Sequence, residues 1–306
     1  MTAGWVAGAV RAKAMARRVL GAEAARQLAG SGSLPQAQRL LMRTAFRDAA
    51  EPGLSLGAAQ HAVAATILWD LRVLAGWLPR DGVSMLRLLA GWFEIANVDE
   101  LLQTLTGRPS GAEFELGALA TAWPRLSEAG SPADLRRALA ASPWGDPGGD
   151  SIRDIRLGMR ARWGARVAAS VDRFRSSAAA AIALLRVGEP TPAAAAGPGA
   201  DLDRATGLPS GLASLPSRGG TQMRLGGQPR SLRAAPRPET EPWQAETDWW
   251  RRVERDGRVL LRSSGFDSDP VLGAVAVMTA DARRVCAALA SAARGGLALE
   301  GYDATV

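Results

Sequence analysis

Apolar residues recur every three or four positions along most of the chain, which is the spacing of one face of an α-helix. The clearest such stripe follows Ser55, a residue type that favours helix N-caps, and it ends at Pro79. Its members are Val63, Ile67, Leu71, Leu74 and Leu78. We therefore predict a long amphipathic helix between Ser55 and Pro79.

A second long stripe follows directly. We expect Asp81 to cap this helix and Gly107 to stop it, because glycine is the favoured residue just beyond a helix end. The stripe consists of Met85, Leu88, Trp92, Ile95, Leu102 and Leu105.

The remaining helical patterns fill most of the chain. One helix is predicted over 5–28, short helices are predicted after Ser33 and Ser131, and further helices over 243–262 and 269–294. Gln36 follows Ser33 at the spacing of a capping box. The longest pattern runs over 152–187 behind Ser151. Strand patterns are almost absent, so we predict an all-α fold.

The amino-acid composition changes between Gly188 and Pro242. This window of about 55 residues contains about nine prolines and nine glycines and shows little hydrophobic periodicity. Such a segment buries too little apolar surface to offset its chain entropy, so it is predicted to be a disordered linker. The chain divides accordingly into helical lobes over 1–187, a linker over 188–242 and closing helices over 243–306.

A short sequence block is repeated about 98 residues further along the chain. It pairs Ser33 with Ser131, Arg39 with Arg137, Leu41 with Leu139, Thr44 with Ser142 and Phe46 with Trp144. Each block precedes a long amphipathic helix. This repeated block supports the hypothesis of a repeated helical unit.

The scarcity of reactive residues excludes many kinds of site. The sequence has one histidine, His61, one cysteine, Cys286, and one lysine, Lys13. A disulfide within the chain, a cysteine-rich zinc site and a histidine-rich metal site are therefore excluded. His61 and Cys286 are expected to be structural, and no catalytic constellation or cofactor motif is found. We predict a protein that is not an enzyme, has no small-molecule substrate and needs no cofactor.

The net charge of +7 is concentrated on one segment. Residues 151–187 hold eight arginines against Asp154 and Asp172. Such a basic face is either a solvated helix surface or a binding surface for an anionic partner. Nucleic acid is disfavoured, because Trp163 and Phe174 lie on the apolar stripe rather than between the arginines.

The segment Trp249-Trp250, followed by Arg251-Arg252, is expected to pack into a helical core, with an interface anchor as the alternative.

No apolar stretch approaches the roughly 20 residues needed to span a bilayer, so we expect a cytoplasmic protein.

The segment Leu86–Gly107 resembles the C-type rotor component of bacterial and archaeal A/V-type rotary ATPases, whose eukaryotic counterpart is the d component. The resemblance rests on an acidic residue, an asparagine and a Leu-Leu pair, here Glu94, Asn97, Leu101 and Leu102. Three other segments resemble that family: the opening helix Trp5 to Arg18, the blocks ending in Phe46 and Trp144, and the tail that opens with Asp269-Pro270. Together they cover residues 5–187 and 243–296.

This resemblance implies pseudo-repeated helical lobes, the third of them shortened. It implies a non-catalytic rotor subunit that couples the central stalk to the membrane c-ring during ATP-linked proton or sodium transport. The protein would then lie peripherally on the cytoplasmic face of the membrane. We hypothesise that Arg153, Arg156 and Arg160 contribute to its partner-facing surface. The alternative is an unrelated helical adaptor that binds an anionic surface through residues 151–187.

Overall fold

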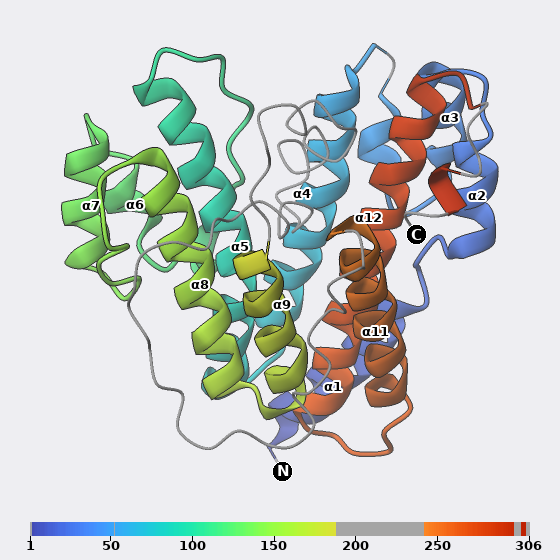
Figure 1. The fold of residues 1–306 in the computed structure, drawn as a ribbon. Helices are drawn as coiled ribbons and strands as arrows, with labels where there is room; N and C mark the ends of the chain where they lie inside the picture. The colour runs from blue at the N-terminus through green and yellow to red at the C-terminus, as the bar shows by residue number, and fades with distance from the viewer. Residues whose placement is uncertain (1, 52, 188–241, 297–300, 304–306) are drawn as a thin grey trace.

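The computed structural model describes residues 2–51, 53–187, 242–296 and 301–303. Within these ranges there is no strand, which confirms the all-α prediction for the described part of the chain (Figure 1). The α-helices are α1 (Ala3–Ala16), α2 (Ala22–Ala29), α3 (Leu34–Leu41), α4 (Leu56–Ala75), α5 (Arg80–Leu105), α6 (Trp123–Leu126), α7 (Pro132–Ala140), α8 (Ile152–Ser170), α9 (Arg175–Val187), α11 (Pro242–Leu261) and α12 (Ser268–Ala293). Short 3-10 turns are η1 (Arg47–Ala50), η2 (Gly117–Leu119) and η3 (Asp172–Phe174). Most of the predicted linker 188–242 lies outside the described residues.

Several helix boundaries follow the local signals in the sequence. The hydroxyls of Ser55, Ser131 and Ser151 each accept a hydrogen bond from the backbone N–H three residues later. These bonds satisfy one of the N–H groups that a helix leaves unpaired at its start. Gly107, with φ +71°, takes the left-handed conformation that ends α5.

Two predicted starts differ in detail. α5 begins at Arg80 after Pro79, which places Asp81 inside the first turn rather than at the cap. Ser33 precedes α3, but its side chain makes no capping bond. Gln36 accepts instead from the N–H of Gly32, so the predicted capping box does not form.

Two predicted long helices are each broken in the structure. The helix expected over 5–28 ends at Ala16, and the chain turns at Gly21, whose φ of +83° is not helical. The helix expected over 152–187 breaks at Val171, where φ is −126° and ψ is 88°. Val171 is buried in the core, and the break allows α9 to fold back and pack against α8. Both breaks therefore serve tertiary packing that a local pattern does not encode.

Helix α5 separates two hydrophobic clusters. Leu86, Ala90 and Phe93 belong to the larger cluster, which also contains residues from α1–α4 and α12. Ile95 and Leu102 belong to a second cluster formed with α6, α7 and α8. The middle of α5 is thus buried on more than the single face that its apolar stripe predicts.

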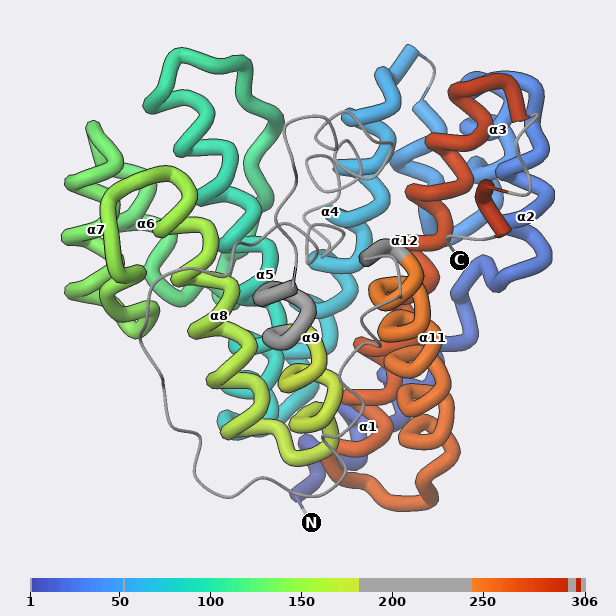
Figure 2. Tube along the Cα trace, viewed as in Figure 1, coloured from blue at the N-terminus to red at the C-terminus, as the bar shows by residue number. Residues whose placement is uncertain are grey.

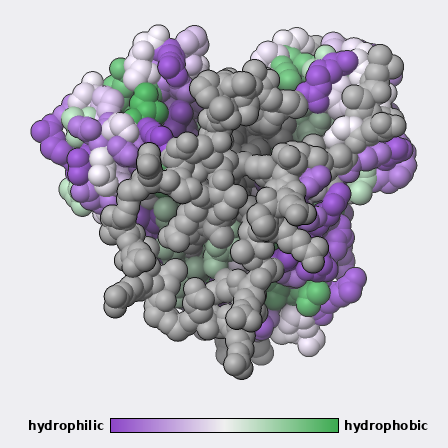
Figure 3. All heavy atoms as spheres, viewed as in Figure 1, coloured by the Kyte–Doolittle hydropathy of each residue, from purple (hydrophilic) through white to green (hydrophobic). Residues whose placement is uncertain are grey.

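Helix α12 is the second central element. It is buried along most of its length and packs against α1, α2, α3, α4 and α11. The Cα trace shows the consequence: α2 and α3 lie at one side of the molecule beside α12, while α6 and α7 lie at the opposite side beyond α5 (Figure 2). In the space-filling view, hydrophilic side chains gather over α6 and α7 and over α11 (Figure 3).

Candidate functional site

Two of the three arginines proposed to face a partner converge on one carboxylate. Arg156 Nε lies 2.9 Å from Asp99 Oδ1, and Arg160 Nη2 lies 2.5 Å from Asp99 Oδ2. Asp99 is on α5, so this cluster joins α8 to α5. Arg160 also places its guanidinium 5.4 Å from the centre of the Trp92 ring, within cation–π range. Arg153 is exposed near the start of α8.

Other arginines of the basic segment also contact groups within the chain. Arg173 makes two hydrogen bonds, of 2.9 and 2.8 Å, to the carboxylate of Asp269 at the start of α12. Arg166 lies over the Trp144 ring at 5.8 Å, and Arg175 pairs with Asp172. Much of the charge that the sequence concentrates on 151–187 therefore holds α8 and η3 against their neighbours.

A fully buried carboxylate, Glu94 on α5, organises the second cluster. Glu94 Oε2 accepts from the backbone N–H of Thr121 at 2.6 Å, and Oε1 accepts from that of Ala122 at 2.8 Å. Oε1 also accepts from the indole Nε1–H of Trp144 at 2.7 Å. Burying a carboxylate is tolerated because charge-assisted hydrogen bonds replace its water. Glu94 thereby anchors the start of α6 and the end of the α7 segment.

Asp281 on α12 accepts hydrogen bonds from the backbone at the start of α2, as Glu94 does at the start of α6. Its Oδ2 accepts from the N–H of Leu20 at 2.7 Å, and its Oδ1 accepts from that of Gly21 at 2.8 Å. Arg284 Nη1 lies 3.4 Å from Oδ1. Burial raises the pKa of Asp281, and the two N–H donors and Arg284 oppose this rise. Sequence reasoning missed Asp281, because an acid within an Ala-rich helix gives no local sign of the chain segment it contacts.

The two copies of the repeated sequence block form turns with the same hydrogen bonds. Thr44 Oγ1 donates to Leu41 O at 2.8 Å and accepts from Phe46 N–H at 3.1 Å. Ser142 Oγ donates to Leu139 O at 2.8 Å and accepts from Trp144 N–H at 3.1 Å. In each turn the hydroxyl places an aromatic side chain that is 2% exposed.

Asn97, on the next turn of α5 after Glu94, fixes the loop that precedes η2. Its amide donates to Phe114 O at 2.9 Å, and its Oδ1 accepts from Phe114 N–H at 2.7 Å. The Phe114 ring stacks on His61 with a centroid distance of 4.2 Å. Burial lowers the pKa of His61, which favours the neutral imidazole in this stack.

The single cysteine is also enclosed. Cys286 is fully buried on α12, with Sγ 3.9 Å from Gln60 O, and burial raises the pKa of its thiol. A buried thiol with a raised pKa is a packing group rather than a nucleophile. Within the described part of the chain, no cluster of three or more His, Cys, Asp or Glu side chains could hold a metal ion.

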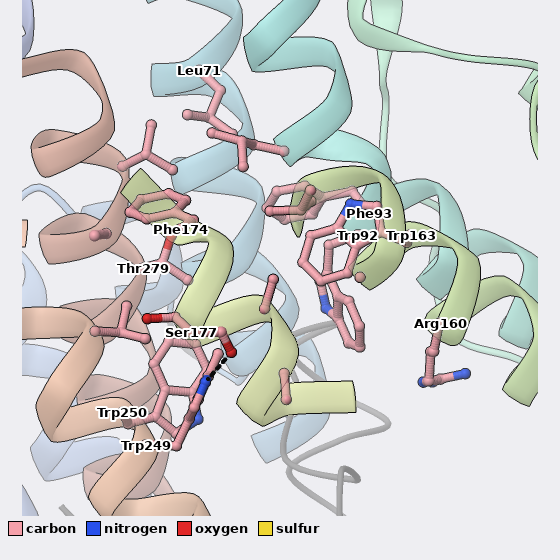
Figure 4. A pocket seen from close by; sticks show the side chains of 18 residues that line it. Leu71, Trp92, Phe93, Arg160, Trp163, Phe174, Ser177, Trp249, Trp250 and Thr279 are labelled. Atoms are coloured by element: carbon pink, nitrogen blue, oxygen red, sulfur yellow. Dashed lines mark hydrogen bonds between the residues drawn. The ribbon is translucent and has the colours of Figure 1, made fainter. Parts of the chain in front are cut away.

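The structure contains a largely apolar cavity of about 130 Å³ among α5, α8, α9, α11 and α12 (Figure 4). Six aromatic side chains line it, and we call it the aromatic cavity: Trp92, Phe93, Trp163, Phe174, Trp249 and Trp250. Arg160 lines it too. Sequence reasoning missed this cavity because helices distant in the chain contribute to its wall.

Hydrogen bonds hold two of its indoles in place. Trp163 Nε1–H donates to Leu88 O at 2.7 Å, and Trp249 Nε1–H donates to Ser177 O at 2.8 Å. The Trp249 and Trp250 rings meet edge to face at a centroid distance of 4.7 Å. Trp250 is only 4% exposed, in agreement with the prediction for this residue, whereas Trp249 is half-buried.

Within the described ranges, no helix combines the length and the apolar character needed to cross a bilayer. The sequence matches no protein-family model and no curated protein.

Proposed function

We propose that this chain is a non-catalytic rotor subunit of a V/A-type rotary ATPase, which couples the central stalk to the membrane c-ring. The family resemblance carried by Glu94, Asn97 and the two Thr/Ser turns motivates this function. The structural observation that supports it best is the parallel between two pairs of short helices, each anchored to a central helix by a buried carboxylate.

The first pair, which we call the α2–α3 lobe, spans residues 20–46. Asp281 accepts from two consecutive backbone N–H groups just before α2, and Thr44 forms the turn that buries Phe46. The second pair, the α6–α7 lobe, spans residues 121–144. Glu94 accepts from two consecutive N–H groups just before α6, and Ser142 forms the turn that buries Trp144. These common features favour the pseudo-repeated lobes that the family resemblance implies.

The anchors suit a part that transmits torque. A lobe attached by a flexible loop would yield when the stalk turns, whereas a fully hydrogen-bonded buried carboxylate holds its partners in one geometry. Each carboxylate acts on the backbone of its lobe directly. In this proposal α5 and α12 form the frame, the lobes face the partners, and catalysis and ion transport occur in other subunits.

The alternative function, an adaptor that binds an anionic surface through residues 151–187, has less support from the contacts. Arg156 and Arg160 pair with Asp99, and Arg173 pairs with Asp269. Guanidinium groups held by carboxylates of the same chain contribute less to the attraction of an anionic partner.

Inverted membrane vesicles from the source cell provide a test of the coupling function. If the chain is depleted, ATP-driven ion uptake should be lost and should return when the wild-type chain is added back. An adaptor unrelated to the rotary ATPase would leave ion uptake unchanged after depletion, and that result would contradict the proposal.

A further inference from the structure

Tryptophan side chains are concentrated around the aromatic cavity. The chain has ten tryptophans, and four of them, Trp92, Trp163, Trp249 and Trp250, line this one space together with Phe93 and Phe174. They come from α5, α8, η3 and α11, which span much of the sequence (Figure 4). Aromatic and apolar walls of this kind are typical of sites for small apolar ligands.

The charge at the edge of the cavity is already neutralised. Arg160 lines the cavity, and its guanidinium forms the 2.5 Å ion pair with Asp99. An anionic ligand would have to compete with that carboxylate, and a cationic ligand would meet the guanidinium. The lining therefore favours an uncharged ligand.

The volume of the cavity indicates the size of the apolar group that it accommodates. Its volume is about 130 Å³. A protein cavity of about 150 Å³ with apolar walls stays dry and binds benzene. One aromatic ring with a small substituent is thus the size of group that this space accommodates.

We propose that the aromatic cavity is a binding site for an uncharged apolar molecule of about the size of one substituted benzene ring. This inference does not depend on the proposed rotor function, because it rests on the wall, the charge and the volume of the cavity. Binding would bring the ligand against indole rings on both sides of the junction between α8–α9 and α11–α12.

Indole N–H resonances of the full-length chain, recorded while toluene is added, test the proposal. We expect saturable shifts for Trp92, Trp163, Trp249 and Trp250. Trp69 and Trp77, which are 58% and 50% exposed on and just after α4, should not shift with the same saturation. Benzoate, which carries the same ring with a charge, should produce no saturable shift.

Variants that fill the cavity sharpen the test. Ala178→Leu and Ala181→Leu each add three carbons to the lining from α9, and each should weaken toluene binding at least tenfold. Ala169→Leu, at an exposed position of α8, is the matched control and should bind as the wild type does. Circular dichroism establishes which filled variant keeps its helices, and that variant is used. Shifts that do not saturate, equal shifts at Trp69 and Trp77, or undiminished binding by the folded filled variant would overturn the proposal.

Discussion

Glu94 on α5 and Trp144, 50 residues further along the chain, are joined by a 2.7 Å hydrogen bond from the indole Nε1–H to a carboxylate that no solvent reaches. The same oxygen accepts from the N–H of Ala122, so one side chain connects α5 to both ends of the α6–α7 lobe. Through these hydrogen bonds the carboxylate organises this part of the fold.

Replacement of Glu94 should therefore be costly. Glu94→Ala leaves the N–H groups of Thr121, Ala122 and Trp144 without their acceptor, and we expect a loss of about 3–5 kcal/mol in the free energy of unfolding. Glu94→Gln keeps one acceptor oxygen and should lose less. Urea unfolding measures both, with Glu128→Gln at an exposed position as the control, expected to change stability by less than about 0.5 kcal/mol. Equal stability of Glu94→Ala and the control would refute the anchoring role.

The raised pKa of Asp281 predicts a specific pH dependence. A carboxyl whose pKa is higher in the folded than in the unfolded state binds its proton more tightly when folded. Its contribution to stability is therefore largest at low pH and declines as the pH rises above the ordinary carboxyl value toward the raised pKa. The free energy of unfolding of the wild type minus that of Asp281→Asn should accordingly fall with increasing pH in this range. Urea titrations at several pH values measure it, and a difference that rises with pH would be inconsistent with this burial effect.

The two Thr/Ser turns should contribute similar stability. Thr44→Ala and Ser142→Ala each remove a hydroxyl that donates to a carbonyl and accepts from a backbone N–H, so each should cost about 1 kcal/mol. Phe46 and Trp144 lie in different hydrophobic clusters, so the losses should add within about 0.5 kcal/mol in the double variant. Thermal or urea unfolding checks both statements. A strong coupling between the two changes would argue against independent lobes.

The cluster around Asp99 separates a structural role from a partner role on α8. Asp99→Asn removes the charge shared by Arg156 and Arg160 and should destabilise the protein by about 1–3 kcal/mol, less at high salt. Urea unfolding measures this loss, with Arg153→Glu at an exposed position of the same helix for comparison.

Assembly then tests the partner-facing hypothesis without the complication of unfolding. If Arg153 contributes to the partner surface, Arg153→Glu should weaken the association with the stalk and the ring although the protein stays folded. Arg162→Glu, also exposed on α8, is the control variant. Full assembly of Arg153→Glu would remove Arg153 from that surface.

Local signals predicted the elements whose causes are local. The serine caps at Ser55, Ser131 and Ser151 and the glycine stop at Gly107 depend on a few neighbouring residues, and the structure confirms them. The break at Val171 depends instead on what α9 packs against. The capping of the Leu20 and Gly21 amides by Asp281 joins positions about 260 residues apart, and no pattern within either segment indicates it.

The candidate site was predictable only in its parts. Arg156 and Arg160 were predicted as candidates from their charge. Their counter-ion Asp99 lies on another helix, so the ion pairs that join α8 to α5 are evident only in the tertiary structure. The aromatic cavity was not predictable for the same reason. Trp92 and Trp163 both fell on apolar stripes, and a stripe indicates burial without indicating that a space is left between the buried rings.

The most direct test of the proposed function is affinity purification of the tagged, full-length chain from membranes solubilised in a mild detergent, followed by mass spectrometry. The proposed rotor role predicts that central-stalk subunits and the c-ring of a rotary ATPase co-purify in fixed ratio with the wild-type chain. Glu94→Ala with Asp281→Ala should lose these partners, because both lobes lose their anchors. Recovery of the folded wild-type chain without stalk or ring subunits would contradict the rotor function.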